Sequence, residues 1–272
     1  MTPQSAHKIL ILFLLFLKCI HGSGMMMHGS GMMMHGDHHY MHSNQEEAVR
    51  SVGLLTMDDM KVGNTIKVKL PFDDTSSSHF LPKDVADSIP FSSSELPNIL
   101  KLFSFSEDSS KASAMKETLI KCEDPPTEGE IKTCATSLES LLDFARNIFV
   151  PSPEPLVLTT THDSTSLGTS ESYKILGFEW FRARKTMACH LMDYPYVVYY
   201  CHHQLYGSEV RVFRVSLEGD KGDKVEGFGS CHMDTSKWNS DHVLFQVTKT
   251  KPGAFPVCHM FLEGELIWVQ PI

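Results

Sequence analysis

The chain has 272 residues, 42% hydrophobic and 21% charged, which is ordinary for a globular protein of one large domain or two small ones. Its formal net charge is −9, which argues against a general nucleic-acid binder, because that role requires a basic face. No Walker loop, Rossmann fingerprint or zincin helix occurs, so none of these motifs defines a function.

The first 22 residues have the pattern of a secretory signal peptide. Lys8 precedes an apolar run over residues 9–17, and small residues follow at 22–24. The run is too short to cross a bilayer core, which requires about 20 apolar residues. We therefore expect a secreted, soluble mature protein that has no membrane attachment after cleavage.

Residues 23–53 form a segment rich in Met, His and Gly without apolar periodicity, which is typical of a flexible, low-complexity stretch. Thioethers select Cu(I), and imidazoles also hold Cu(II). We interpret the segment as a copper-collecting arm, with a tolerated low-complexity linker as the alternative. Its candidate copper ligands are His28, His35, His38, His39 and His42.

From residue 54 onward the composition indicates folded structure. Alternating apolar residues at 66, 68 and 70 predict a strand. Short helices are predicted within "LPKDVADSI", which has Pro82 in its first turn, and within "SSELPNILKLF", and a longer one within "EDSSKASAMKETLIKCE". The strongest helix prediction covers residues 127–149, where apolar residues recur at three- and four-residue steps before Pro151.

Seven cysteines are present, and Cys19 would leave with the signal peptide. An even number in a secreted chain suggests disulfides, in any of fifteen complete pairings, with buried free thiols as the alternative. Eleven residues separate Cys122 from Cys134, at the end of one predicted helix and inside the next. A bridge there would join a helical hairpin and stabilise it by roughly 3 kcal/mol.

After Pro155 the sequence becomes rich in Val, Ile, Tyr, Phe and Thr, in runs separated by Gly and charged clusters. These runs predict strands. The expected fold class is α+β, with a helical first half joined by a disulfide and a mostly antiparallel sheet in the second half that carries the remaining cysteines.

Each of these four cysteines is followed directly by a histidine. The pairs are Cys189-His190, Cys201-His202, Cys231-His232 and Cys258-His259. Adjacent side chains of a strand point to opposite faces, so cysteines on one face can form disulfides while histidines on the other converge on a metal. A zinc site with mixed Cys and His ligands is a rival, and hydrogen-bonded packing is the alternative for any single histidine. His203 would point to the other face and is not a candidate.

Imidazoles suit copper, zinc, nickel or iron, and the Met- and His-rich arm favours copper among these.

The four Cys-His pairs, with eight residues between His259 and Trp268, resemble the signature of the plant BURP domain. The stretches "LPKDVADSIPFSSSELP", "CATSLESLLDFA", "YPYVVYYCH" and "CHMDTSKW" before "DHV" are similar as well, so the resemblance covers residues 54–272. The gap of 28 residues between the second and third pairs is about one residue longer than the family's usual range. The resemblance implies copper binding by the four paired histidines, with His242 of "DHV" as a further candidate.

The resemblance also implies two kinds of function. Many members are non-catalytic proteins of cell walls, seeds, vacuoles, development or stress responses, while others are copper-dependent cyclases that cross-link a Tyr or Trp of a core peptide. Before residue 54 the only aromatic residue past the signal peptide is Tyr40. We therefore expect a non-catalytic copper protein of the cell wall or vacuole, whose partner is a wall polysaccharide or wall enzyme. A cyclase acting on a core peptide, with Tyr40 as a possible cross-link, is the alternative.

Overall fold

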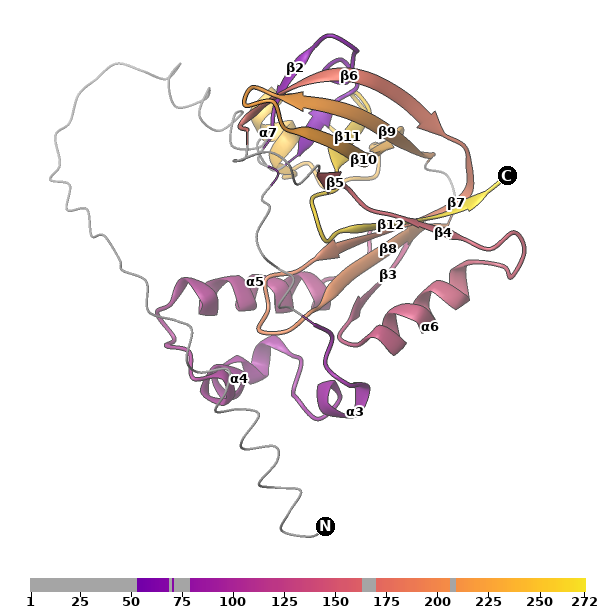
Figure 1. Ribbon diagram of the computed structural model, residues 1–272. Coiled ribbons are helices and arrows are strands. Elements are labelled where there is room, and N and C mark those ends of the chain that lie inside the picture. Colours follow the sequence, from indigo (N-terminus) through magenta and orange to yellow (C-terminus); the bar gives the residue numbers. More distant parts are fainter. Residues whose placement is uncertain (1–52, 69, 71–78, 163–169, 206–208) are drawn as a thin grey trace, which may run out of the picture. The chain divides into compact units, whose positions relative to one another are not determined.

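The computed structural model describes residues 53–68, 70, 79–162, 170–205 and 209–272, all of which belong to one compact unit (Figure 1). The predicted signal peptide, the Met- and His-rich arm and Tyr40 lie outside the described residues. No helix among the described segments is long and apolar enough to span a membrane.

Most of the described helices precede the long strands. They are α3 (Lys83–Ala86), the 3-10 turn η2 (Ser93–Glu95), α4 (Leu96–Phe103), α5 (Ser110–Glu123), α6 (Leu138–Ile148) and α7 (Val243–Thr248). Serine hydroxyls begin the two longest ones, because a hydroxyl can accept a hydrogen bond from an otherwise unpaired first-turn amide. Ser109 accepts from the amide of Ala112, and Ser137 forms a reciprocal capping box with Ser140.

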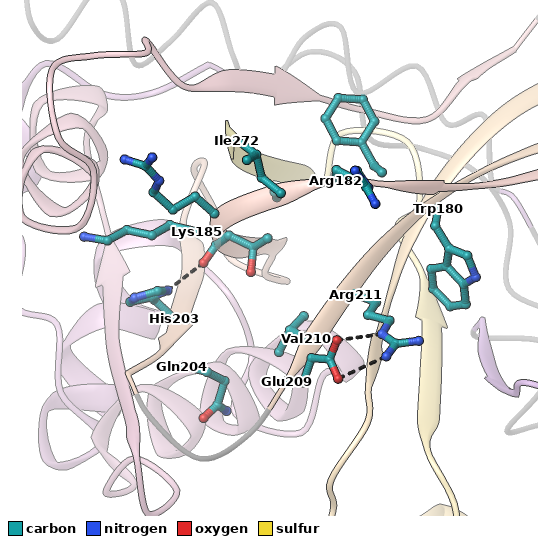
Figure 2. Close-up of a pocket in the computed structure, with 13 residues that line it drawn as sticks. Trp180, Arg182, Lys185, His203, Gln204, Glu209, Val210, Arg211 and Ile272 are labelled. Atoms are coloured by element: carbon teal, nitrogen blue, oxygen red, sulfur yellow. Dashed lines mark hydrogen bonds and ion pairs between the residues drawn. The ribbon is translucent and has the colours of Figure 1, made fainter.

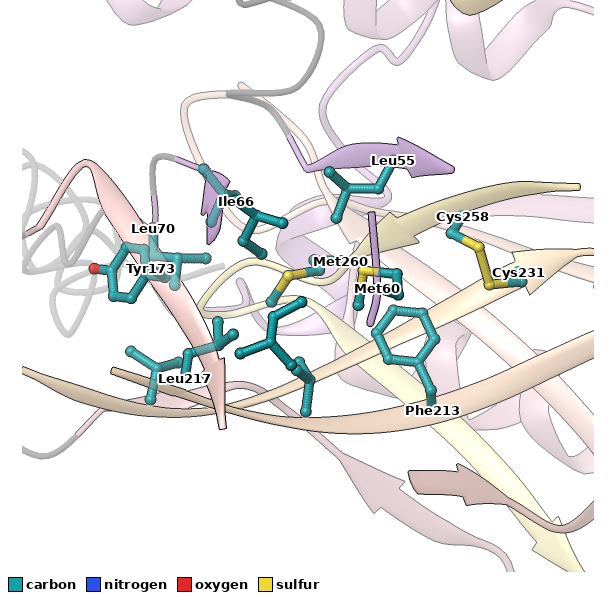
Figure 3. Packing of buried hydrophobic residues seen from close by; sticks show 14 residues of the cluster. Leu55, Met60, Ile66, Leu70, Tyr173, Phe213, Leu217, Cys231, Cys258 and Met260 are labelled. Carbon is teal, nitrogen blue, oxygen red and sulfur yellow. A yellow bond between two sulfur atoms is a disulfide. The ribbon is translucent and has the colours of Figure 1, made fainter. Parts of the chain in front are cut away.

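The larger sheet, sheet A, has seven strands in the order β1-β11-β10-β9-β6-β2, with β5 also paired to β10. Their bounds are β1 Leu54–Thr56, β2 Thr65–Lys67, β5 Thr161–His162, β6 Ser172–Phe181, β9 Val210–Gly219, β10 Lys224–His232 and β11 Val257–Met260. All of its strand pairs are antiparallel. Its core cluster gathers Tyr173, Phe213, Leu217 and Met260 around residues of the first two strands (Figure 3).

The smaller sheet, sheet B, has five antiparallel strands in the order β3-β8-β7-β12-β4. Their bounds are β3 Glu130–Ala135, β4 Leu156–Leu158, β7 Ala183–Leu191, β8 Tyr199–Gln204 and β12 Leu266–Pro271. Helix α6 packs on this sheet, because its buried Leu141 and Ala145 share a core cluster with Met187 of β7. Burying such apolar side chains on one helix face is what holds an amphipathic helix to a sheet.

The α+β prediction is confirmed in its coarse form, since helices accompany mostly antiparallel sheets. The division into a helical half and a sheet half is too simple, because β1, β2 and β3 lie in the first half and α7 in the second. The strands predicted around residue 66 and the helices predicted around Pro82 and residues 96–123 are present.

The strongest helix prediction is wrong in its first part. Residues Glu130–Ala135 form β3, which pairs along all six residues with β8, and the helix begins only after Ser137. Ile131 and Cys134 fit a helical period by spacing, but pairing with a neighbouring strand satisfies the same backbone groups and overrides that local preference.

All six cysteines of the described residues form disulfides, and the predicted bond between Cys122 and Cys134 is confirmed. It joins the end of α5 to β3 rather than two helices, because Cys134 lies in a strand. The other two are Cys189–Cys201 and Cys231–Cys258. Free thiols and a zinc site built on these sulfurs are therefore excluded in this state.

Candidate metal centre

The two disulfides of the Cys-His pairs have the same construction in different sheets. Cys189 and Cys201 are directly opposite each other on β7 and β8 of sheet B. Cys231 and Cys258 are directly opposite each other on β10 and β11 of sheet A. The Cα atoms are 4.0 and 3.9 Å apart, and all four cysteines are fully buried. Each pair of strands is thus joined at a fixed register.

This register determines where the four histidines of the Cys-His pairs lie. His190 lies opposite Tyr200 and His202 opposite Ala188, so the two histidines occupy diagonal positions beside the disulfide. In sheet A, His232 and His259 have the same diagonal relation. Because side chains alternate along a strand, each diagonal pair projects to the face opposite its disulfide.

The two histidine pairs meet one another. Ring centroids are 5.5 Å apart for His190 and His202, 6.1 Å for His202 and His232, 5.7 Å for His232 and His259, and 5.2 Å for His259 and His190. The four imidazoles therefore form a closed cycle between two strands of each sheet. We call this group the histidine cluster.

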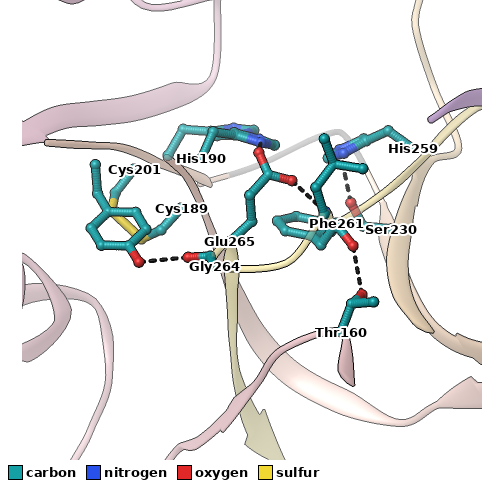
Figure 4. A network of polar contacts seen from close by, with 12 residues as sticks. Thr160, Cys189, His190, Cys201, Ser230, His259, Phe261, Gly264 and Glu265 are labelled. Carbon is teal, nitrogen blue, oxygen red and sulfur yellow. Dashed lines mark hydrogen bonds and ion pairs between the residues drawn. A yellow bond between two sulfur atoms is a disulfide. The ribbon is translucent and has the colours of Figure 1, made fainter. Parts of the chain in front are cut away.

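Glu265 orients one member of the cluster. Its Oε1 accepts from Nδ1 of His190 at 2.9 Å, and its Oε2 accepts from the amide of Leu262 at 2.7 Å (Figure 4). A neutral imidazole that donates through Nδ1 keeps its lone pair on Nε2. Carboxylates in this position are common behind metal-binding histidines, because they fix the tautomer and raise ligand basicity.

Glu130 faces a second member. Its Oε2 is 3.6 Å from Nδ1 of His202, too long for a hydrogen bond but close enough for an electrostatic contact. The carboxylate also accepts from the Nε2 of Gln204 at 3.0 Å and from the hydroxyl of Tyr200 at 3.4 Å. Burial alone would raise the pKa of Glu130, but His202, with smaller contributions from His232 and Tyr200, outweighs it and the pKa lies below its usual value.

The Nε2 atoms of His190 and His202 face each other at 3.4 Å. Either the proton on Nε2 of His202 forms a hydrogen bond to Nε2 of His190, or a cation lies between the two nitrogens in place of that proton. Two nitrogens bound tetrahedrally to one ion at 2.0–2.1 Å would be about 3.4 Å apart. This pair therefore already has the nitrogen separation that a shared metal ion requires.

The other two histidines contribute neutral nitrogens. Burial, together with a smaller contribution from the neighbouring imidazoles, lowers the pKa of His232 to about 3. Burial and the neighbouring imidazoles also hold the pKa of His259 well below its usual value. The Nδ1 of His232 is buried without a hydrogen-bond partner among the described residues, while Nε2 of His259 is 3.0 Å from the Ser230 hydroxyl. A buried polar atom without a partner is costly, and a metal bond would satisfy it.

The cluster as it stands is not a complete coordination sphere. No three His, Cys, Asp or Glu side chains of the described residues are already arranged to hold a metal ion. The rings of His232 and His259 are stacked, with 16° between their planes. The donor set of the four residues fits a metal that prefers imidazole, such as copper.

His242 lies apart from the cluster. Its ring contacts Trp238 and Phe245, at centroid distances of 4.8 and 5.5 Å, and Trp238 in turn contacts His232 at 5.0 Å. The Nδ1 of His242 accepts from the amide of Leu244 at the start of α7. The structure thus places four of the five predicted ligands together and the fifth behind a tryptophan.

Sequence reasoning missed the two carboxylates. Glu265 occurs in an unremarkable "LEGEL" stretch, and Glu130 fell within the segment predicted as helix. Only strand pairing brings β3 and β12 next to β8 and β7, so no short-range pattern could have identified either residue.

Comparison with known proteins identifies the family of the chain. Residues 54–270 match the family model of the BURP domain. The chain is 40% identical over 223 residues to BURP domain-containing protein BNM2C of Brassica napus, covering 78% of this chain and 77% of that protein. It is 39% identical over 222 residues to BURP domain protein USPL1 of Arabidopsis thaliana, covering 79% and 78% respectively. It is 41% identical over 201 residues to BURP domain-containing protein 17 of Oryza sativa subsp. japonica, covering 72% of this chain but only 34% of that protein. The chain belongs to the BURP-domain family of plant proteins.

Proposed function

We propose that this chain is a secreted copper-binding protein whose domain ligands are His190, His202, His232 and His259. The observation that carries the proposal is the pair of facing Nε2 atoms at 3.4 Å, with the carboxylate of Glu265 behind His190. Imidazoles bind copper strongly in both common oxidation states, so these four ligands could store copper or let it exchange an electron.

Oxidation of the cysteines supports the same assignment. Thiolates would compete with the imidazoles for a soft metal, and the two cross-strand disulfides remove them. Three disulfides are also typical of proteins that fold in an oxidising compartment, which agrees with the signal-like first 22 residues. We place the protein in the cell wall or vacuole, in a non-catalytic developmental, seed or stress-related role.

Copper titration of variants tests the ligand set. Residues 23–42 are deleted first, so that the histidines and methionines of the arm do not contribute to the number of copper ions bound per chain. His190→Ala and His232→Ala should then each lower the copper bound by the domain, while His203→Ala should not. His203 is the matched control, because it neighbours His202 but its Nδ1 contacts the carbonyl oxygen of Thr186. Unchanged stoichiometry in both cluster variants would make these histidines packing residues.

One observation favours testing catalysis in parallel. The ring of Tyr200 lies 5.6 Å from that of His202 and 6.4 Å from that of His190, so a phenol ring can pack against the cluster. A core-peptide tyrosine such as Tyr40 would have to approach in a similar way. Cross-linking two side chains removes two hydrogens, so the peptide that carries Tyr40 would become about 2 Da lighter with copper and oxygen. We expect no such shift, and a loss that disappears in Tyr40→Phe would establish the cyclase instead.

A further inference from the structure

A second site lies on the other side of β8 from the histidine cluster. A cleft of about 580 Å³ is bordered by the end of β6, the start of β7, the end of β8 and the start of β9 (Figure 2). His203 lines it, whereas its neighbour His202 belongs to the cluster. The cleft is therefore separate from the candidate metal centre, and an inference about it does not depend on copper.

The cleft is strongly basic in a chain whose formal net charge is −9. Four cationic side chains line it, and the only acidic side chain among its lining residues is Glu209. Glu209 is already paired with Arg211, with contacts of 2.7 and 3.2 Å. The other cations are Arg182, Arg184 and Lys185.

Two of these cations are available to a ligand. Arg182 and Arg184 are exposed, and neither forms an ion pair with any described side chain. Arg182 directly precedes β7 and Arg184 is its second residue, so both lie where the strand enters the cleft. Arginine holds carboxylates with two parallel hydrogen bonds, which makes a pair of free arginines a carboxylate-binding surface.

The backbone beside these arginines is also open. On one side of β7, strand β12 pairs with it from Ala183 onward. On the other side, β8 pairs with β7 only from Ala188 to Leu191. Along residues 183–187 no described strand pairs with the β8-facing edge, and the side chain of His203 contacts the carbonyl oxygen of Thr186 at 2.7 Å instead. An unpaired strand edge inside a cleft can accept an extended peptide as an additional strand.

Aromatic side chains complete the cleft. Trp180 and Phe181 form part of its wall, and the guanidinium of Arg211 lies 5.9 Å from the centre of the Trp180 ring. This contact and the pairing with Glu209 hold Arg211 at the wall. The cleft thus offers apolar surface, free positive charge and backbone hydrogen-bonding groups together.

We propose that this cleft binds an acidic peptide segment in extended conformation, which adds to the open edge of β7 and places its carboxylates on Arg182 and Arg184. The open edge favours a peptide over an acidic polysaccharide, because a polysaccharide has no backbone that continues a β ladder. Alternating acidic and apolar residues suit the site best, since successive side chains of the added strand point to opposite faces.

Fluorescence anisotropy with short labelled peptides tests the proposal on the full-length disulfide-bonded protein. The probe is an acetylated, amidated hexapeptide of alternating Asp and Val, and its matched control replaces every Asp by Asn. The acidic peptide should bind at least tenfold more tightly than the Asn control and lose affinity as salt is raised. The double variant Arg182→Gln/Arg184→Gln should weaken binding about tenfold or more, because two charge-assisted contacts are lost.

A matched double variant controls for net charge. Lys101→Gln/Lys116→Gln removes two exposed lysines from α4 and α5, which do not line the cleft, and should leave the affinity within about twofold. A peptide N-methylated at alternate amides should bind much more weakly, because it cannot continue the ladder. Equal binding of the Asp and Asn peptides, equal losses in both double variants, or full affinity of the N-methylated peptide would overturn the proposal. Tighter binding of a linear hexauronate than of the acidic peptide would instead assign the cleft to polysaccharide.

Discussion

The buried histidines should make the metal-free protein lose stability on mild acidification. Burial lowers the pKa of His232 to about 3 and holds that of His259 well below the usual value near 6.5, so these two groups stay neutral in the fold. In the unfolded chain they protonate as the pH falls through 6.5. The unfolded state then binds more protons, and the free energy of unfolding falls with pH. The stability is fully present above pH 6.5 and is lost below it.

The magnitude follows from linkage. Between pH 7.0 and 5.5, a histidine that stays neutral in the fold costs about 1.3 kcal/mol of stability, so two such groups cost about 2.5 kcal/mol. Urea unfolding in EDTA with intact disulfides measures this difference. His232→Phe should reduce it by about half, because one of the two titrating groups is removed.

A core substitution that carries no charge provides the control. Met187→Leu should change the stability at both pH values by the same amount, since Met187 is fully buried and does not ionise. Equal stability at pH 7.0 and 5.5, or an undiminished pH dependence in His232→Phe, would show that the cluster is not neutral in the folded protein.

Three further predictions concern the supports of the cluster. Glu265→Gln should weaken copper binding by about 10- to 100-fold, because the carboxylate no longer fixes His190, whereas Glu263→Gln at an exposed position should not; competition titration measures both. Replacing both cysteines of the β7–β8 disulfide by Ala should reduce the free energy of unfolding by roughly 3 kcal/mol and also lower copper binding. The α5–β3 disulfide is the control, because it spans the same sequence separation of 12. Its replacement by Ala should reduce stability without changing copper binding. Gly229→Ala should lower the thermal midpoint through a loss of about 1–3 kcal/mol, because a Cβ there would overlap the Phe213 ring and lie 2.5 Å from the carbonyl oxygen of His259.

The sequence was most informative where a local period determines the structure. Period-two alternation was sufficient to expect cysteines and histidines on opposite sides of the Cys-His strands. It could not identify which cysteines pair, because strand order is a long-range property of the fold. The same limit explains the error at β3, where Ile131 and Cys134 have helical spacing but the segment pairs with β8. Glu265 was invisible for this reason, since only the pairing of β12 with β7 brings it to His190.

The cross-strand disulfides also impose an order on maturation. A slip of one residue between paired strands would turn every side chain to the opposite face, and a covalent link between directly opposed residues forbids it. Before oxidation, the free sulfurs would themselves be the preferred ligands of a soft metal. If the histidine cluster binds copper as proposed, thiol oxidation has to precede metal loading, because it both fixes the imidazoles on one side and removes the competing sulfur ligands. On this account, a chain that meets copper before its disulfides form would bind it in the wrong place.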